Sequence, residues 1–281
     1  MLIRSDNAGS SVLPVAIFLL FCGAIVLLLY AFQHSLIYRA RSYAATDLPA
    51  GVEEIRYHTT DGEQVAFLVP PRDPAPGPPE RLWVAFGGNA SLALDWMDFV
   101  SRYPDQRAAF LLVDYPGFGK CEGKASPRSI RESSEKLLEQ YHARLTSRGA
   151  EGLPPLHLLG HSLGAAAALQ IAARRDVSRL VLLAPFTTLR AMARKAVGDP
   201  LSRLLRHDYD NVARLKEIVA SPSPPLVVII HGRRDEVIPV EMGRRLATEF
   251  PSLIRYVELA GADHNSLLLL NEAEVTRAMT E

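Results

Sequence analysis

The hydrophobic pattern of the chain begins with one long apolar run. Residues 12–32 contain no charged side chain. Twenty-one residues in a helix rise about 30 Å, which is the thickness of the hydrocarbon core of a bilayer. Tyr30, Phe32 and Tyr38 gather at the C-terminal end of the run, where aromatic rings with a polar edge favour the headgroup region. The pattern therefore predicts a transmembrane helix near the N-terminus.

A cleaved secretory signal is the alternative interpretation of this run. Such a signal has a shorter apolar stretch, followed by a cleavage site of small residues. This run is longer, and the sequence at its end, Tyr-Ala-Phe-Gln-His, offers no such site. We therefore expect an uncleaved membrane anchor. The nearby charges, Arg4 before the run and Arg39 and Arg41 after it, favour neither orientation under the positive-inside rule.

Beyond this run, short apolar segments alternate with amphipathic ones. Segments 52–59 and 64–70 flank the turn dipeptide Asp61-Gly62 and predict an opening hairpin. Runs typical of buried strands follow at residues 82–86, 109–113, 156–159, 180–184, 226–230 and 254–259. Segments with helical spacing lie between them, at residues 129–146, 163–174 and 241–250. Continuous apolar strands separated by helices indicate an α/β fold, with a mostly parallel central sheet and helices on both faces.

Composition limits which classes of partner and cofactor we expect. The chain has 281 residues, of which nearly half are apolar, and this excludes a disordered protein. The 31 basic residues balance the 31 acidic ones and form no basic stripe, so we expect no nucleic-acid partner. Neither Cys-x-x-Cys nor His-Glu-x-x-His occurs, so we predict no metal site.

The chain is long enough for one large α/β domain. Between the run that ends near Phe186 and the run that begins near Leu226 lies an insertion with a helix-like first half. We expect this insertion to form a small cap over the sheet. The expected segments are a tail (residues 1–11), the transmembrane anchor (12–32), a linker (33–50) and the α/β domain (51–281), with the cap at about 187–225.

The pentapeptide Gly160-His161-Ser162-Leu163-Gly164 is the first candidate for chemistry. It follows an apolar run and opens an alanine-rich segment, so a strand, a sharp turn and a helix succeed one another. That setting exposes a serine hydroxyl above the sheet, where it can act as a nucleophile. Glycines on both sides let neighbouring backbones approach closely. We predict that Ser162 is the nucleophile.

A serine nucleophile needs a base and an acid, which follow it in the order acid, then histidine, in this kind of fold. Asp235 lies in the loop after the run 226–230, and we predict it as the acid, with its neighbour Glu236 as the rival. His264 follows the last strand-like run and is the histidine that lies in a loop beyond the acid. We predict His264 as the general base.

Attack on a carbonyl also needs donors for the oxyanion. The first donor expected is the backbone N–H of Leu163, directly after the nucleophile. The second should lie in the loop after the run 82–86, which reads Gly87-Gly88-Asn89-Ala90. We predict that the N–H of Asn89 supplies it.

These residues resemble a known family. The similarity rests on motifs that occur in the same order: Phe86-Gly87-Gly88-Asn89-Ala90, Asp114-Tyr115-Pro116-Gly117-Phe118-Gly119, Gly160-His161-Ser162-Leu163-Gly164, Ala184-Pro185-Phe186-Thr187, His231-Gly232-x-x-Asp235 and Gly261-x-x-His264-Asn265. In these motifs the chain resembles the Bem46/ABHD13/ABHD17-like serine hydrolases of the α/β-hydrolase superfamily, including their bacterial relatives. One departure is Gly87, where those relatives usually have histidine.

The resemblance implies an α/β-hydrolase fold and hydrolysis of carboxylic esters or thioesters through an acyl-enzyme on Ser162, without a cofactor. An anchored enzyme favours substrates that partition into lipid, such as lipids or acylated proteins. Alternatives are a serine peptidase with the same triad, a catalytically silent hydrolase fold that serves as a binding protein, and haloperoxidase- or lyase-like chemistry on the same scaffold.

Overall fold

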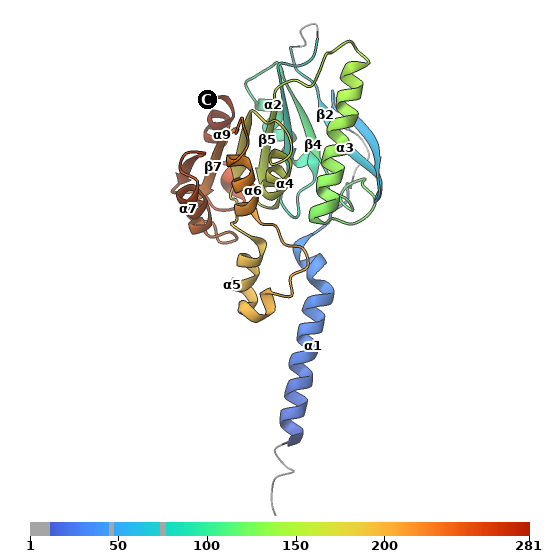
Figure 1. Ribbon diagram of the computed structural model, residues 1–281. Coiled ribbons are helices and arrows are strands. Elements are labelled where there is room, and N and C mark those ends of the chain that lie inside the picture. The colour runs from blue at the N-terminus through green and yellow to red at the C-terminus, as the bar shows by residue number, and fades with distance from the viewer. Residues whose placement is uncertain (1–11, 45–47, 74–76) are drawn as a thin grey trace, which may run out of the picture.

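A long helix projects from an α/β domain in the computed structural model, which describes residues 12–44, 48–73 and 77–281 (Figure 1). The helix, α1 (Val12–Ile37), continues five residues beyond the predicted end at residue 32. Of the described helices, it is the one long and apolar enough to cross a membrane. Its most apolar part is not buried in the domain, so α1 is not a core helix. The predicted tail, residues 1–11, lies outside the described residues.

The domain is built on one eight-stranded sheet with the strand order β1-β2-β4-β3-β5-β6-β7-β8. The strands are β1 (Glu53–Thr59), β2 (Gly62–Val69), β3 (Arg81–Phe86), β4 (Ala108–Val113), β5 (Leu156–His161), β6 (Arg179–Leu183), β7 (Leu226–Gly232) and β8 (Ile254–Leu259). The β1–β2 and β2–β4 pairs are antiparallel, and every pair from β4 to β8 is parallel. The mostly parallel sheet predicted from the apolar runs is confirmed.

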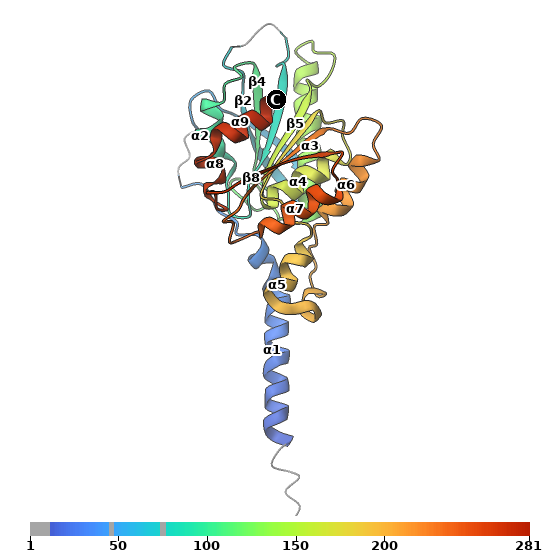
Figure 2. The ribbon, with the colours of Figure 1, turned by 90° about the vertical axis from the view of Figure 1, so that its left-hand side faces the viewer.

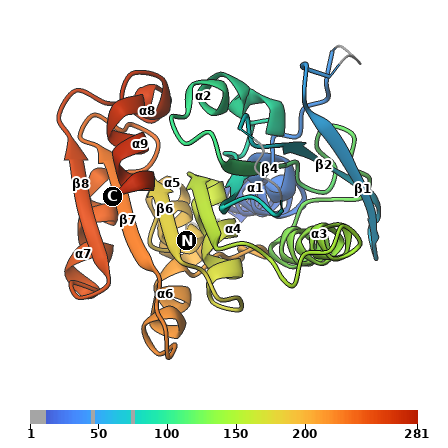
Figure 3. The same ribbon diagram turned by 90° about the horizontal axis from the view of Figure 1, so that it is seen from above.

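Helices cover both faces of the sheet (Figure 3). One face carries α3 (Pro127–Thr146), α4 (Leu163–Ala172), α6 (Asn211–Val219) and α7 (Val240–Glu249). The other carries the 3-10 turn η2 (Ala93–Trp96) with α2 (Met97–Arg102), α8 (Ser266–Leu269) and α9 (Glu272–Thr280). A hydrophobic core lies on each face of the sheet, and alternate residues of β3 point into the two cores. Val84 packs in the core on the first face, and Trp83 packs in the core on the second. Both cores are built mainly of buried apolar side chains, so they pack the sheet between its two helix layers.

The insertion after β6 divides into two parts. Its second helix, α6, buries Leu215 and Ile218 in the core beside α4. Its first helix, α5 (Leu189–Ser202), buries only Ser202 and bends at Gly198, whose φ is 82°, just before Pro200. Figures 1 and 2 show α5 projecting from the domain at the end from which α1 emerges.

Candidate active site

Ser162 lies in a strained turn between β5 and α4. Its backbone has φ 56° and ψ −116°, a conformation that L-residues rarely adopt. The turn is held because the Ser162 N–H donates to the carbonyl of Leu183 at 2.9 Å. The side chain is nearly buried, and α4 begins with the next residue. This geometry presents the hydroxyl above the sheet, at the N-terminal end of a helix.

The glycines of the pentapeptide permit this turn. A Cβ at Gly160 would lie 2.3 Å from the carbonyl oxygen of Gly164. A Cβ at Gly164 would lie 2.1 Å from the carbonyl oxygen of Phe86, at the end of β3. No side chain fits at either distance, so β3, β5 and α4 can approach one another only because both residues are glycine.

Asp235 and His264, which are 29 residues apart, meet at the same edge of the sheet. Nδ1 of His264 lies 2.7 Å from Oδ2 of Asp235. The other carboxylate oxygen, Oδ1, accepts the backbone N–H groups of Val237 at 2.9 Å and Ile238 at 2.7 Å. The rival, Glu236, is exposed and forms no ion pair or hydrogen bond with His264 in the described chain. The structure thus orients Asp235 toward the imidazole and Glu236 away from it.

The Asp235 carboxylate is stabilised in its ionised form. Burial raises the pKa of Asp235, but hydrogen bonds from His231 and His264 outweigh burial and hold the pKa well below its ordinary value. His231 is fully buried, and its Nε2 lies 2.9 Å from the carbonyl oxygen of Ile238 and 3.5 Å from Oδ2 of Asp235. Since both oxygens only accept, Nε2 of His231 carries the proton. Sequence analysis did not predict this contact of a second histidine with Asp235, because His231 precedes the acid and lies at the end of a buried strand.

His161 links the serine turn to the base. Burial lowers the pKa of His161 to about 4, so its ring is neutral at pH 7. Its Nε2 lies 3.1 Å from the carbonyl oxygen of His264, and the two rings are 4.7 Å apart. Ser162 forms no hydrogen bond with His264 in the described chain. Such contacts often tighten only when a substrate binds, so the missing hydrogen bond does not argue against a role of the two residues as a pair.

Two backbone N–H groups beside Ser162 are free to receive an oxyanion. Neither the N–H of Leu163 nor that of Asn89 donates a hydrogen bond within the described chain. Both residues line the same cavity as Ser162. The loop that carries Asn89 is fixed from below, where the Tyr115 hydroxyl donates to the carbonyl of Gly87 at 2.6 Å. The N–H groups of Leu163 and Asn89 are the kind of donor that acyl transfer requires.

The segment after α1 also holds this loop. The backbone N–H of Arg39 donates to the carbonyl of Asn89 at 2.9 Å. The Arg41 guanidinium donates to the carbonyl of Ala90 at 3.1 Å and to Asp95 at 2.9 Å. Sequence reasoning missed these residues because they lie some fifty positions before the loop that they support.

Asp114 is a buried carboxylate beneath the same loop. It accepts the hydroxyl of Tyr43 at 2.7 Å and the backbone N–H of Ala93 at 2.8 Å. Burial raises the pKa of Asp114 to about 6. The side chain does not line the cavity at Ser162, so its contacts are structural: they tie the segment after α1 to the turn η2.

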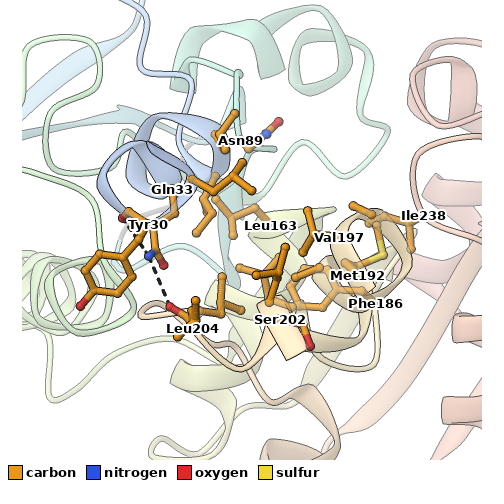
Figure 4. A pocket seen from close by; sticks show the side chains of 18 of the residues that line it. Tyr30, Gln33, Asn89, Leu163, Phe186, Met192, Val197, Ser202, Leu204 and Ile238 are labelled. Carbon is orange, nitrogen blue, oxygen red and sulfur yellow. Dashed lines mark hydrogen bonds between the residues drawn. The ribbon is translucent and has the colours of Figure 1, made fainter. Parts of the chain in front are cut away.

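A cavity of about 370 Å³ opens above Ser162, a volume within the range of small-molecule sites. Its lining includes Ser162. Leu163 and Asn89 lie at one end of it, and residues of α1 and α5 line its sides (Figure 4). Among the described residues, no charged side chain lines it. The site therefore fits an apolar group next to a polar centre of reaction.

Comparisons with known proteins agree with the fold. Residues 75–217 match the model of the alpha/beta hydrolase family. An uncharacterized protein of Mycobacterium tuberculosis is 27% identical over 92% of this chain and 89% of its own length. The alpha/beta hydrolase domain-containing protein 17B of Xenopus laevis is 27% identical over 57% of this chain and 51% of its own length. A solved esterase of Pyrococcus furiosus has 15% identity and a TM-score of 0.63, covering 85% of this chain and 96% of that chain. The resemblance found in the sequence motifs is confirmed, and the chain belongs to the alpha/beta hydrolase family.

Proposed function

We propose that this hydrolase is a membrane-anchored serine hydrolase that cleaves carboxylic esters or thioesters. The observation that carries the proposal is the combination of a strained, nearly buried Ser162 with the 2.7 Å hydrogen bond between His264 and Asp235 at the same edge of the sheet. Nucleophile, base and orienting acid are the parts that acyl transfer to serine needs.

The reaction proceeds in two halves. Ser162 Oγ attacks the carbonyl carbon while Nε2 of His264 takes its proton, and Asp235 holds the Nδ1–H of the imidazolium. The N–H groups of Leu163 and Asn89 stabilise the tetrahedral oxyanion. Collapse breaks the ester or thioester bond, and His264 returns the proton to the leaving alcohol or thiol. Water, deprotonated by the same histidine, then attacks the acyl-enzyme, releases the acid and restores the serine.

The anchor is part of the proposal. Helix α1 is long and apolar enough to span a bilayer and passes without a break into the segment that supports the oxyanion loop. Cleavage after the apolar run would leave Arg39 and Arg41 on a free chain end, no longer joined to the helix that precedes them, which favours an uncleaved helix. The proposed organisation is therefore a spanning helix, a linker that packs on the domain, and a hydrolase domain whose cap is the projecting part of the insertion.

A serine-to-alanine pair tests the assignment. Ser162→Ala should lower kcat/KM for a p-nitrophenyl ester by about 10⁴-fold or more and abolish labelling by a fluorophosphonate. The matched control is Ser223→Ala, because Ser223 is exposed and lies between α6 and β7, away from the site. Thermal unfolding should show that both variants fold. Full turnover by Ser162→Ala, or failure of the folded wild type to be labelled, would disprove the proposal.

A matched ester and amide pair with the same acyl group separates esterase from peptidase. The ester is expected to be the better substrate by more than its higher intrinsic reactivity, because the described residues that line the cavity include no charged group to select a peptide side chain. Faster cleavage of the amide would assign the triad to a peptidase instead.

A further inference from the structure

One wall of the catalytic cavity is the N-terminal helix itself. The lining residues of α1 include Val26, Leu29, Tyr30, Gln33 and Ile37. Positions three and four apart lie on one face of a helix, so these side chains form a single stripe. The opposite face points away, as at Leu28, which is 56% exposed. The helix thus has a cavity side and an outer side.

Helix α5 forms the facing wall. It contributes Leu189, Met192, Ala196, Val197 and Leu201 to the lining. These side chains are only half-buried or exposed. An occupant that is apolar along its length would cover both walls, which favours a hydrocarbon chain.

Helix α1 is also held by the segment of the cap that follows α5. Gln33 accepts the N–H of Arg206 at 2.7 Å, and its amide donates to the carbonyl of Leu204 at 3.4 Å (Figure 4). The Arg206 guanidinium lies 5.6 Å from the ring centre of Tyr30. Below them, the hydroxyls of Tyr38 and Tyr209 are 3.1 Å apart. The helix is therefore held against the cap as a fixed wall, which a simple tether would not require.

The cavity extends along α1 into its membrane-spanning part. From Ile37 to Val26 the helix rises about 16 Å. Val26 and Leu29 belong to the apolar run 12–32, so this end of the cavity lies at the level of the bilayer. An acyl chain that enters there moves from the hydrocarbon of the bilayer into an apolar cavity. Its apolar surface is not exposed to water on the way, and so the free-energy cost of that exposure is avoided.

The exposed surface of α5 fits the headgroup region of an anionic bilayer. Arg194 and Lys195 are exposed and form no ion pair with a described acidic residue. Val197 and Leu204, 37% and 43% exposed, lie near them in the sequence. Cationic side chains beside exposed apolar ones are typical of a surface that rests on anionic lipids.

We propose that α1 and α5 together form an acyl-binding site that takes the fatty acyl chain of a membrane lipid ester directly from the bilayer. This inference rests on the proposed serine hydrolase function and specifies its substrate class. The carbonyl lies at Ser162, the chain follows α1 toward Val26, and the headgroup stays at the membrane surface near the cationic part of the cap. The anchor helix is thereby a determinant of specificity.

A pair of tryptophan substitutions on opposite faces of α1 tests the wall. Leu29→Trp fills the cavity side, and Leu28→Trp is the control on the outer side. The full-length proteins are compared in nanodiscs on a 1-palmitoyl phosphatidylglycerol and on p-nitrophenyl acetate. Leu29→Trp should lower the ratio of kcat/KM for the palmitoyl ester to kcat/KM for the acetate roughly tenfold, equivalent to about 1.4 kcal/mol. Leu28→Trp, outside the cavity, should leave this ratio within about twofold of the wild-type value.

The outcomes separate the two proposals. Acetate hydrolysis and fluorophosphonate labelling report on the triad, and their absence in the wild type would refute the serine hydrolase function. If they are present but both tryptophan variants hydrolyse the palmitoyl ester equally, α1 is not a wall of the site. An S-palmitoyl peptide in the same nanodiscs is assayed as a second substrate, because an acylated protein would present the same acyl chain. If the peptide is cleaved tenfold faster than the lipid, the lipid source is overturned.

Discussion

Asp235→Asn is the substitution that most directly tests how the base is oriented. In the wild type, Oδ1 of Asp235 accepts the N–H groups of Val237 and Ile238, and Oδ2 faces Nδ1 of His264 at 2.7 Å. The amide oxygen of asparagine would keep the two backbone donors, which places its NH₂ group toward the imidazole. That NH₂ group also faces Nε2–H of His231, 3.5 Å from Oδ2, so only His264 can accept from it.

The consequence is a change of tautomer. Nδ1 of His264 then accepts a hydrogen bond, so the ring proton moves to Nε2, and Nε2 can no longer take the proton of Ser162. An imidazole fixed in the wrong tautomer costs a serine hydrolase about 10⁴-fold in kcat, equivalent to about 5.5 kcal/mol in the barrier. The fold should tolerate the change, because the asparagine has the shape of the aspartate and keeps both backbone contacts.

The assay is steady-state hydrolysis of a p-nitrophenyl ester, with thermal unfolding as the check on folding. The adjacent Glu236→Gln variant is the control, since Glu236 is exposed and makes no contact with His264, and its activity should stay within about twofold of wild type. The reasoning is refuted if Asp235→Asn keeps more than a tenth of the activity, or if Glu236→Gln loses most of it.

Three further substitutions probe the surroundings of the site. Gly164→Ala places a Cβ 2.1 Å from the carbonyl oxygen of Phe86 and should lower the free energy of unfolding by about 1–3 kcal/mol in urea titrations; an unchanged midpoint would contradict this. Because burial raises the pKa of Asp114 from 3.8 to about 6, the folded state holds the proton more tightly, and the wild type should lose about 3 kcal/mol of stability as pH rises from about 4 to 6. Asp114→Asn should lack this loss. If the stability of the variant and of the wild type changed with pH in parallel, this reasoning would be wrong. Arg41→Ala removes the donor to Ala90 at 3.1 Å and should lower kcat about tenfold with little change in KM, as expected for a looser oxyanion donor; a rise in KM alone would point to a binding role.

The sequence by itself determined the local elements and the order of the candidate catalytic residues. A buried parallel strand is a short continuous apolar run, so the runs around residues 82–86 and 226–230 correspond to β3 and β7. The turn at Ser162 has its own local signature, because glycines are needed on both sides of it. Helices α2 and α8 escaped prediction, because six and four residues are too few to show a helical period.

Only the tertiary structure decided which residues meet. Asp235 and Glu236 are neighbours of the same chemical type, and the choice between them depends on the path of the loop that directs one toward His264. Arg41 reaches Ala90 across 49 positions, and the stripe of α1 that contains Leu29 faces α5 across more than 150. Periodicity and turn chemistry are carried by adjacent residues, whereas these contacts arise from the closure of the whole sheet and the emergence of α1 beside the cap. The sequence could therefore indicate a membrane helix and a reactive serine, but not that the helix forms a wall of the cavity above it.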